Sequence, residues 1–299
     1  MGFNGRDDCA RPRRRLSKPA IRRKQDALSL DPNRDARAAR DLLVAAAREA
    51  GELALASFRA GGRTSAAVQW KQGGSPVTEA DFAADALLKR RLGDRLPEAG
   101  WLSEETEDDA ARLGLRSLLI VDPIDGTRAF IDGDPRWTVS VALIVDGRPF
   151  AAVVHAPALV ETFAAARGAG AERNGAALER SARINGSGYV AAGPRRILAA
   201  MEARLGEPLD IRPFVPSLAY RLCLAAAGAL DFAVAATDSH DWDVAAADLM
   251  LEEAGARLVG ASGERLTYNE ARTRRGALLA TPEALAPRLL EAFRAAAGA

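Results

Sequence analysis

The chain has few of the residues that build disulfides and soft metal sites. It contains two cysteines, Cys9 and Cys223, and two histidines, His155 and His240. Disulfide frameworks and cysteine zinc sites need more thiols than this, and a histidine-rich metal site needs more imidazoles. A metal bound by this chain would therefore be a hard ion held by carboxylates. His155 and Cys223 lie in apolar contexts, which favours packing roles for both.

Long apolar runs are also absent. The longest apolar stretches are far shorter than the roughly 20 residues that span a bilayer, so we expect no contact with a membrane. The basic start is not followed by the apolar segment of a signal peptide. These features predict a cytoplasmic protein. Because 48% of the residues are hydrophobic, the chain can still build a large core.

Charge is balanced overall but unevenly distributed. The formal net charge is +1, yet residues 1–25 carry nine basic and two acidic side chains, which leaves 32 basic and 38 acidic ones in the rest. Residues 1–35 have no periodicity and are predicted to form a disordered basic tail. A nucleic-acid-binding domain is usually basic. We therefore expect no nucleic acid to bind, except through this tail.

Hydrophobic periodicity divides the remaining chain into two parts. It predicts helices at 36–60, 78–96, 195–205, 217–228, 241–255 and 282–297, and strands at 66–70, 98–102, 117–121, 138–145, 150–155 and 161–166. The first part is rich in consecutive strands, whereas strands and helices alternate in the second. We therefore predict an α+β domain over 36–180 and an α/β domain over 181–299.

The strongest chemical signal lies in the segment SLLIVDPIDGT. Its apolar run predicts a buried strand that ends at Asp122, and the following proline and glycine favour a turn. In a helical turn, Asp122 and Asp125 would lie on the same side with Cβ atoms about 5–6 Å apart. Carboxylates that close repel each other unless a cation lies between them. The amides of Gly126 and Thr127 would face the same space and suit an anion.

Other acidic residues accompany this segment, and each also has an ordinary structural explanation. Glu104 and Glu105 follow a predicted strand but resemble a solvated acidic loop. Asp243 opens a helix, where a negative charge favours the dipole. Asp81 completes a capping box that begins at Thr78. Taken alone, even the DPIDGT segment is compatible with a solvated turn.

Taken together, the motifs resemble a known family. DPIDGT at 122–127 and WDVAAADLMLEEAG at 242–255 are similar to the two signature segments of the inositol monophosphatase family, and SPVTEAD at 75–81 and the glutamate pair occur in the expected order. The resemblance covers about residues 36–299. It implies a layered α-β-α-β-α sandwich of the sugar-phosphatase type, with both α+β and α/β character. It also implies a homodimer that hydrolyses small phosphorylated metabolites with two or three Mg²⁺ ions.

The resemblance implies a role for individual residues. The expected metal ligands are Glu104, Asp122, Asp125, Asp243 and the carbonyl of Ile124. Two-metal activation of water would follow, with Asp122 shared by both ions. Asp81 and Thr127 match the pair that orients this water, Glu105 matches an acid behind the ligands, and Lys71 matches a loop lysine near the metals. Substrate contacts are expected from Glu104, Asp125, Gly126, Thr127, Arg128 and Asp243.

The residues after DGT bear on the substrate. They continue as Arg128-Ala129-Phe130-Ile131, which is similar to the 3′(2′),5′-bisphosphate nucleotidase branch of the family. We therefore predict hydrolysis of adenosine 3′,5′-bisphosphate, with Arg128 either a donor to the second phosphate or a solvated side chain. Inositol 1-phosphate and histidinol phosphate are the alternatives, since a histidinol-phosphate phosphatase branch has a similar continuation.

A function of a different class is also compatible with the sequence. Some relatives act in RNA or transcription complexes without catalysis, and the basic tail could serve such a role. Deleting residues 1–35 separates the two hypotheses. An enzyme would keep its turnover, whereas a nucleic-acid-binding factor would lose an affinity that depends steeply on salt.

Overall fold

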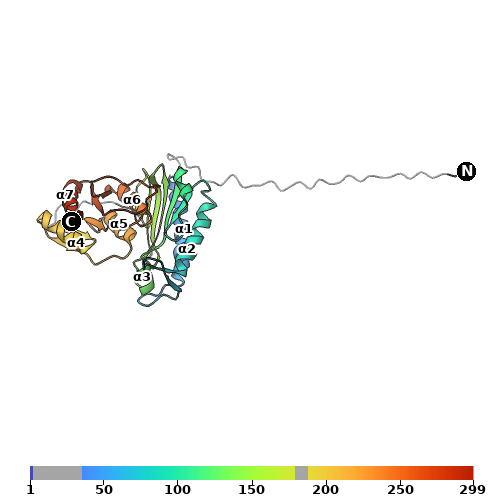
Figure 1. The fold of residues 1–299 in the computed structure, drawn as a ribbon, viewed down its shortest axis with the longest axis horizontal. Helices are drawn as coiled ribbons and strands as arrows, with labels where there is room; N and C mark the ends of the chain where they lie inside the picture. Colours follow the sequence, from blue (N-terminus) through green and yellow to red (C-terminus); the bar gives the residue numbers. More distant parts are fainter. Residues whose placement is uncertain (3–35, 179–187, 299) are drawn as a thin grey trace.

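Helices and sheets alternate through the molecule in a computed structural model that describes residues 1–2, 36–178 and 188–298. From one side to the other, Figure 1 shows a pair of helices, a sheet, a second pair of helices, a second sheet and a third pair of helices. This order is the predicted α-β-α-β-α sandwich. Residues 3–35 of the tail predicted at 1–35, and the domain boundary predicted near 180, lie outside the described residues.

The first sheet has seven strands in the order β3-β4-β5-β6-β7-β8-β9. Its strands are β3 (Gly100–Ser103), β4 (Ser117–Asp125), β5 (Thr138–Val145), β6 (Arg148–Ala156), β7 (Glu161–Ala166), β8 (Ala171–Arg173) and β9 (Ala176–Ala177). Helices α1 (Ala36–Leu55) and α2 (Glu79–Gly93) cover one face, and α5 (Leu218–Ala226) and α6 (Asp241–Glu253) cover the other. Because both faces are covered, every residue of β4 and β5 is buried.

The second sheet has five strands in the order β11-β10-β12-β14-β13. Its strands are β11 (Leu209–Ile211), β10 (Tyr189–Ala192), β12 (Phe232–Ala235), β14 (Leu278–Pro282) and β13 (Ala256–Gly260). One face packs on α5 and α6, and the other packs on α4 (Arg195–Leu205) and α7 (Ala286–Ala297). Helices α5 and α6 therefore lie between the two sheets and join them in one core.

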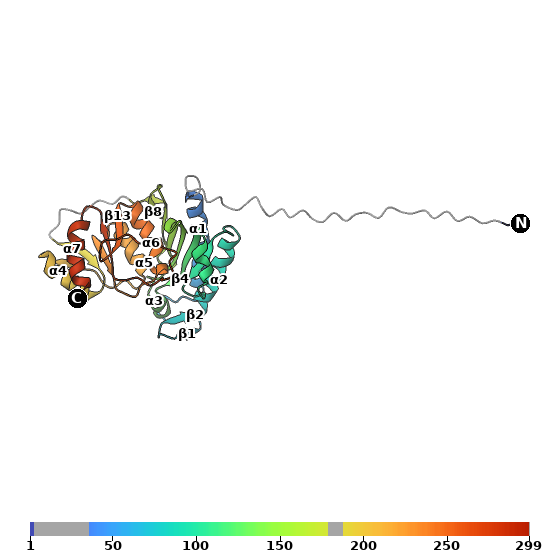
Figure 2. The ribbon, with the colours of Figure 1, turned by 45° about the horizontal axis from the view of Figure 1, so that its top comes forward.

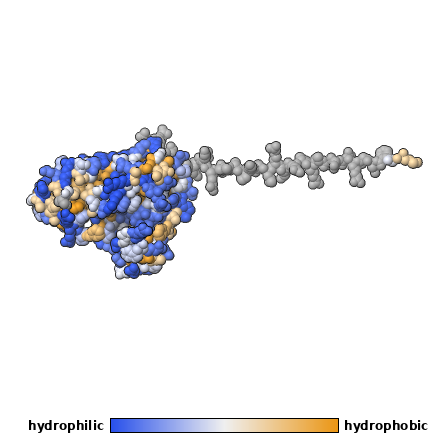
Figure 3. Space-filling model, in the orientation of Figure 1, coloured by the Kyte–Doolittle hydropathy of each residue, from blue (hydrophilic) through white to orange (hydrophobic). Residues whose placement is uncertain are grey.

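The helices that face water each bury one side. Leu43 and Ala47 of α1 are buried against the first sheet, and Leu289 and Phe293 of α7 are buried against the second. The face of the molecule in Figure 3 is mainly hydrophilic, with apolar side chains scattered over it. Among residues 36–178 and 188–298, no helix combines the length and the apolarity needed to cross a membrane.

Two helix predictions were wrong at one end. The first helix stops at Leu55, before the predicted residue 60, because Phe58 turns inward and its ring packs 5.8 Å from Phe130 and 5.7 Å from Trp137. The last helix begins at Ala286, after the predicted residue 282, because the chain as far as Pro282 continues strand β14. In both cases a tertiary contact overrides the local helix preference.

The strand that carries the aspartates was also predicted too short. It was expected to end at Asp122 in a helical turn, but β4 continues to Asp125 because Asp125 pairs with Thr138 of β5. The register shifts between Asp122 and Asp125 and so accommodates the intervening proline. The left-handed Gly126, with a φ of 95°, then turns the chain into the short helix α3 (Thr127–Asp132).

A small hairpin lies beside α3. Strand β1 (Val68–Trp70) pairs antiparallel with β2 (Pro76–Thr78), and its loop contains Lys71. Figure 2 places both strands next to α3 at one end of the molecule. The hairpin leads directly into α2. Its loop lysine, Lys71, contacts two of the acidic side chains described below.

Candidate active site

Three carboxylates converge between the first sheet and α6. Asp122 and Asp125 come from the end of β4, and Asp243 comes from the first turn of α6. One ligand atom from each lies within 4.8 Å of the others. The structure thus brings three of the predicted ligands together, and their role as metal ligands stays a prediction.

Backbone and hydroxyl groups hold these carboxylates in place. Asp122 Oδ1 accepts a hydrogen bond from the Ile124 amide at 3.1 Å, and Asp125 Oδ2 accepts from the Ser217 hydroxyl at 2.6 Å and the Ala219 amide at 2.7 Å. The His240 amide donates to Asp243 Oδ2 at 2.6 Å. Among the described residues, no lysine or arginine forms an ion pair with any of the three aspartates.

The electrostatics of the cluster favour a cation. Burial raises the pKa of Asp122 and of Asp243 well above the usual value, and it raises the pKa of Asp125 to about 6. Repulsion from neighbouring carboxylates, including Glu104, acts in the same direction. Buried negative charges without a cationic partner are costly. Rigid carboxylate oxygens are the ligands that Mg²⁺ prefers, so the donor set fits this ion.

Glu104 was predicted as a fourth carboxylate ligand, and it lies beside the cluster in an ion pair. Lys71 Nζ is 2.9 Å from Glu104 and 2.8 Å from Glu105. The Glu104 amide bonds to the Val121 carbonyl at 3.2 Å, which ties it to β4 next to Asp122. Burial raises the pKa of Glu105 to about 7 although Lys71 opposes that shift. The single positive charge of Lys71 thus compensates part of the charge of these two acids, which form no other ion pair among the described residues.

Asp81 and Thr127 meet as predicted. Asp81 Oδ2 closes the capping box of α2 by accepting from the Thr78 amide and hydroxyl at 2.8 and 2.6 Å. Its other oxygen lies 3.2 Å from Thr127 Oγ1, which is also 3.1 Å from the carbonyl oxygen of Ile124. Burial raises the pKa of Asp81 to about 6. Asp81 therefore both caps the helix and contacts the hydroxyl beside the cluster.

Arg128 binds the hairpin. Its Nη2 donates to the Gly74 carbonyl at 2.9 Å, and its guanidinium lies 5.8 Å from the ring centre of Trp70. The side chain is exposed. No other hydrogen bond of this guanidinium is found among the described residues, and the predicted phosphate contact stays a prediction.

Sequence reasoning missed two residues on the far side of Asp125. Arg221 of α5 is only 6% exposed, its Nε has no hydrogen-bond partner, and no ion pair of this side chain is found within the described part of the chain. Its guanidinium lies 5.8 Å from the ring centre of Phe214, which is 69% exposed. An arginine inside the apolar run LAYRLCLAA was the signal that could have revealed this site.

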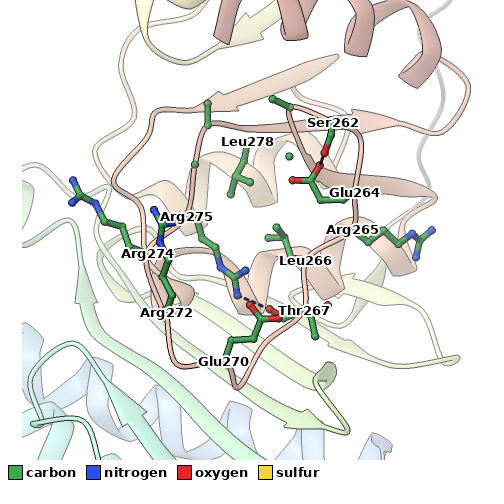
Figure 4. Close-up of a pocket in the computed structure, with 14 residues that line it drawn as sticks. Ser262, Glu264, Arg265, Leu266, Thr267, Glu270, Arg272, Arg274, Arg275 and Leu278 are labelled. Carbon is green, nitrogen blue, oxygen red and sulfur yellow. Dashed lines mark hydrogen bonds between the residues drawn. The ribbon is translucent and has the colours of Figure 1, made fainter. Parts of the chain in front are cut away.

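One residue of a separate pocket binds the start of α6. The pocket has a volume of about 690 Å³, is lined by fourteen residues between Gly260 and Leu278, and includes none of the three clustered aspartates. Figure 4 shows Arg275 among these residues, bound to the Thr267 carbonyl. Arg275 Nε also donates to the buried Asp241 at 2.5 Å. This ion pair fixes the first turn of α6 and hence the position of Asp243.

The fold and the carboxylate cluster together define a class of metal-dependent phosphatases. The sequence model described as "Inositol monophosphatase family" matches residues 35–297, so the chain belongs to this family. Its members depend on Mg²⁺ and hydrolyse phosphate monoesters, which makes the chain a phosphoric monoester hydrolase.

Individual relatives carry several substrate names. A histidinol-phosphatase of Chlorobaculum parvum is 35% identical over 72% of this chain and 82% of its own length. The 3′(2′),5′-bisphosphate nucleotidase CysQ of Aggregatibacter actinomycetemcomitans is 29% identical over 76% of this chain and 86% of its own. The structure of the extragenic suppressor protein SuhB from Bartonella henselae superposes with a TM-score of 0.73, 28% identity and coverage of 86% and 98%. The similarity to the SuhB structure confirms the sandwich fold.

Proposed function

We propose that the chain is a 3′(2′),5′-bisphosphate nucleotidase that removes a phosphate from adenosine 3′,5′-bisphosphate. The ions would be held by Asp122, Asp125 and Asp243, with Glu104 and the Ile124 carbonyl completing the set. When bound, Mg²⁺ supplies charge neutralisation for the phosphate and a water of lowered pKa. The observation that carries the phosphatase chemistry is the buried cluster of three aspartates, none of which forms an ion pair with a lysine or arginine of the described residues.

The water-facing side of the site is formed by Asp81 and Thr127. With Thr127 Oγ1 donating to Asp81 Oδ1 across 3.2 Å, the hydroxyl can accept a hydrogen bond from the attacking water and pass its own proton to the Asp81 carboxylate as it takes the water's proton. The pKa of Asp81, raised to about 6 by burial, suits proton transfer near neutral pH. Glu105 acts indirectly, because it accepts a hydrogen bond from the ammonium of Lys71 and so holds that group against Glu104.

The leaving group is expected on the opposite side, along α5. In phosphoryl transfer the attacking and leaving oxygens lie roughly in line. Thr127 contacts Asp81 at the start of α2, whereas Asp125 accepts from Ser217 at the start of α5, so the two contacts lead to different helices. A group bonded to the departing oxygen would therefore lie near the residues that α5 carries.

Arg221 supports a leaving group that is itself an anion. A guanidinium that is almost fully buried and has an unpartnered Nε is costly unless a ligand binds it. A second phosphate would supply paired oxygens in the geometry that an arginine fork matches. Inositol has no charge to offer, and the ammonium of histidinol would be repelled. Arg221 therefore favours a bisphosphate over either alternative.

Histidinol phosphate is the second candidate because its enzymes are among the more similar relatives. Two histidinol-phosphatases are 35% and 34% identical to this chain, against 29% for CysQ. The deciding experiment is phosphate release with Mg²⁺ from adenosine 3′,5′-bisphosphate, inositol 1-phosphate and histidinol phosphate side by side. We expect the highest kcat/KM for the nucleotide. A preference for either other ester would contradict the nucleotidase proposal and leave the metal site intact.

The Arg221→Gln variant tests the second phosphate directly. Loss of a charge-assisted hydrogen bond should raise KM for adenosine 3′,5′-bisphosphate by about tenfold or more. The KM for inositol 1-phosphate should stay unchanged, and Arg221→Lys should restore part of the nucleotide affinity. The exposed Arg204→Gln serves as the control of equal charge change. Equal effects of Arg221→Gln on both substrates would show that Arg221 is structural.

A further inference from the structure

The exposed aromatic ring of Phe214 lies near α5, where the leaving group is expected. Phe214 is 69% exposed and lies in the loop that precedes α5, three residues before Ser217. Three residues of extended chain span at most about 11 Å. The backbone of Phe214 is therefore at most this far from Ser217, whose hydroxyl donates to Asp125 of the cluster at 2.6 Å.

The backbone of Phe214 is fixed although its ring is exposed. The Phe214 carbonyl accepts a hydrogen bond from Arg136 Nη1 at 2.8 Å, and Arg136 in turn forms an ion pair with Asp134. A Cβ on Gly126 would lie 3.4 Å from the Ser217 amide and 3.5 Å from the Arg136 carbonyl. The turn that follows Asp125 therefore packs on both segments that position Phe214. The backbone that carries the ring is therefore held in place before a ligand binds.

The contacts of the ring leave room for a ligand. The guanidinium of Arg221 lies 5.8 Å from its centre, and most of the ring surface is open to solvent. Two other aromatic side chains of the described residues, Trp70 and Phe82, are also exposed. The ring of Trp70 is next to Arg128, and the exposed Phe82 follows the buried Asp81 in α2. Of these three rings, Phe214 is the one beside Arg221 and in the loop that leads to Ser217.

We propose that Phe214 is a specificity-determining residue that stacks on the purine base of the substrate. This inference rests on the proposed nucleotidase function and adds the residue that recognises the nucleoside. The phosphate to be cleaved binds at the carboxylate cluster, the second phosphate binds Arg221, and the base covers the open surface of the Phe214 ring. Stacking of a base on an aromatic ring depends on the shared face and needs no hydrogen bonds.

The experiment compares adenosine 3′,5′-bisphosphate with its abasic ribose analogue, which has both phosphates and no base. Phe214→Ala should raise KM for the nucleotide by about tenfold or more, with kcat nearly unchanged and no effect on the abasic compound. Phe214→Trp should retain nucleotide affinity. Phe214→Leu, which keeps an apolar side chain without an aromatic face, should behave like Phe214→Ala.

The possible outcomes separate the two proposals. A wild-type enzyme that prefers the nucleotide, with Phe214→Ala leaving its KM unchanged, would overturn stacking and keep the nucleotidase function. Equal losses on the nucleotide and the abasic compound would show that Phe214 acts on loop structure only. A wild-type enzyme with no preference for the nucleotide would overturn both proposals. Thermal unfolding of each variant verifies that the loop change leaves the fold intact.

Discussion

Among the predicted ligands, Asp122 is the one expected to be shared by both metal ions. It is buried at the end of β4, one oxygen bonds to the Ile124 amide, and its pKa is raised by burial and by three neighbouring aspartates and Glu104. Asp122→Asn keeps the size of the side chain and removes one negative charge. We expect kcat to fall by several orders of magnitude in a Mg²⁺ titration, because cation binding loses its central ligand.

The exposed Asp132 provides a matched control for this variant. Asp132→Asn makes the same chemical change in the helix that follows the site and should leave kcat unchanged. Near-normal Mg²⁺-dependent turnover in Asp122→Asn would contradict the proposed ligand set.

Thr127 is expected to act on the proton of the attacking water. Its hydroxyl lies between Asp81 and the Ile124 carbonyl, at 3.2 and 3.1 Å. Thr127→Ala should lower kcat by roughly 10²–10⁴, the usual contribution of a positioned proton-transfer group, and Thr127→Ser should restore most of it. Mg²⁺ affinity, measured by calorimetry, should stay the same. If Thr127→Ala abolished Mg²⁺ binding, the hydroxyl would be a metal ligand.

At the scale of elements, the regular segments were predictable from the sequence, but the ends that depend on tertiary contacts were not. The helix at 195–205 was predicted to the residue, because an apolar stripe and a glycine define it locally. The end of β4 depends on Asp125 pairing with Thr138 of another strand, which no local pattern reveals. The aspartates were found because motif spacing fixes them. Arg221 was missed as a site residue because its candidate role depends on its being buried near Asp125, which the local sequence does not reveal.

The β1–β2 hairpin carries Lys71, the cation that pairs with Glu104 and Glu105 beside the proposed metal site. Lys71 contacts Glu104 and the nearly buried Glu105, whose side chain is 2% exposed. Lys71→Met should lower the Tm of the metal-free protein by a few degrees, because Glu105 loses its partner. It should also increase the gain in Tm on adding Mg²⁺, because Glu104 no longer has a competing cation.

Lys89→Met is the control for the hairpin variant. Lys89 lies over the ring of Trp101 and contacts no carboxylate of the site. Its removal should leave the response to Mg²⁺ unchanged. Identical responses of the two lysine variants would contradict a role for the hairpin in charge compensation.

At the scale of the whole molecule, the distribution of charge connects the cluster to the sequence. The residues after 25 carry six more acidic than basic side chains. Part of this excess is the group of aspartates that no arginine or lysine pairs with among the described residues. Bound divalent ions would reduce the excess and turn the site from repelling phosphate to attracting it. The homodimer, the cytoplasmic location and the role of residues 1–35 stay predictions.

The same charges predict how stability depends on pH and Mg²⁺. Because the pKa values of Asp122, Asp125 and Asp243 are raised in the folded state, the folded chain holds more protons than the unfolded chain above about pH 4. Their contribution to the stability of the metal-free protein is therefore greatest at low pH and is lost as pH rises through the folded pKa values, which is about 6 for Asp125.

Comparison of wild type with Asp122→Asn isolates this effect, because oppositely acting groups such as His155, whose pKa is lowered to about 4, are present in both. In EDTA at pH 7.5, Asp122→Asn should unfold at a higher temperature than wild type, and the difference should shrink at pH 5. Saturating Mg²⁺ at pH 7.5 should raise the wild-type Tm more than that of the variant, since only the folded wild type keeps the full ligand set. Equal Tm values in EDTA at both pH values would mean that the cluster holds no uncompensated charge, and the metal site would have to be sought elsewhere.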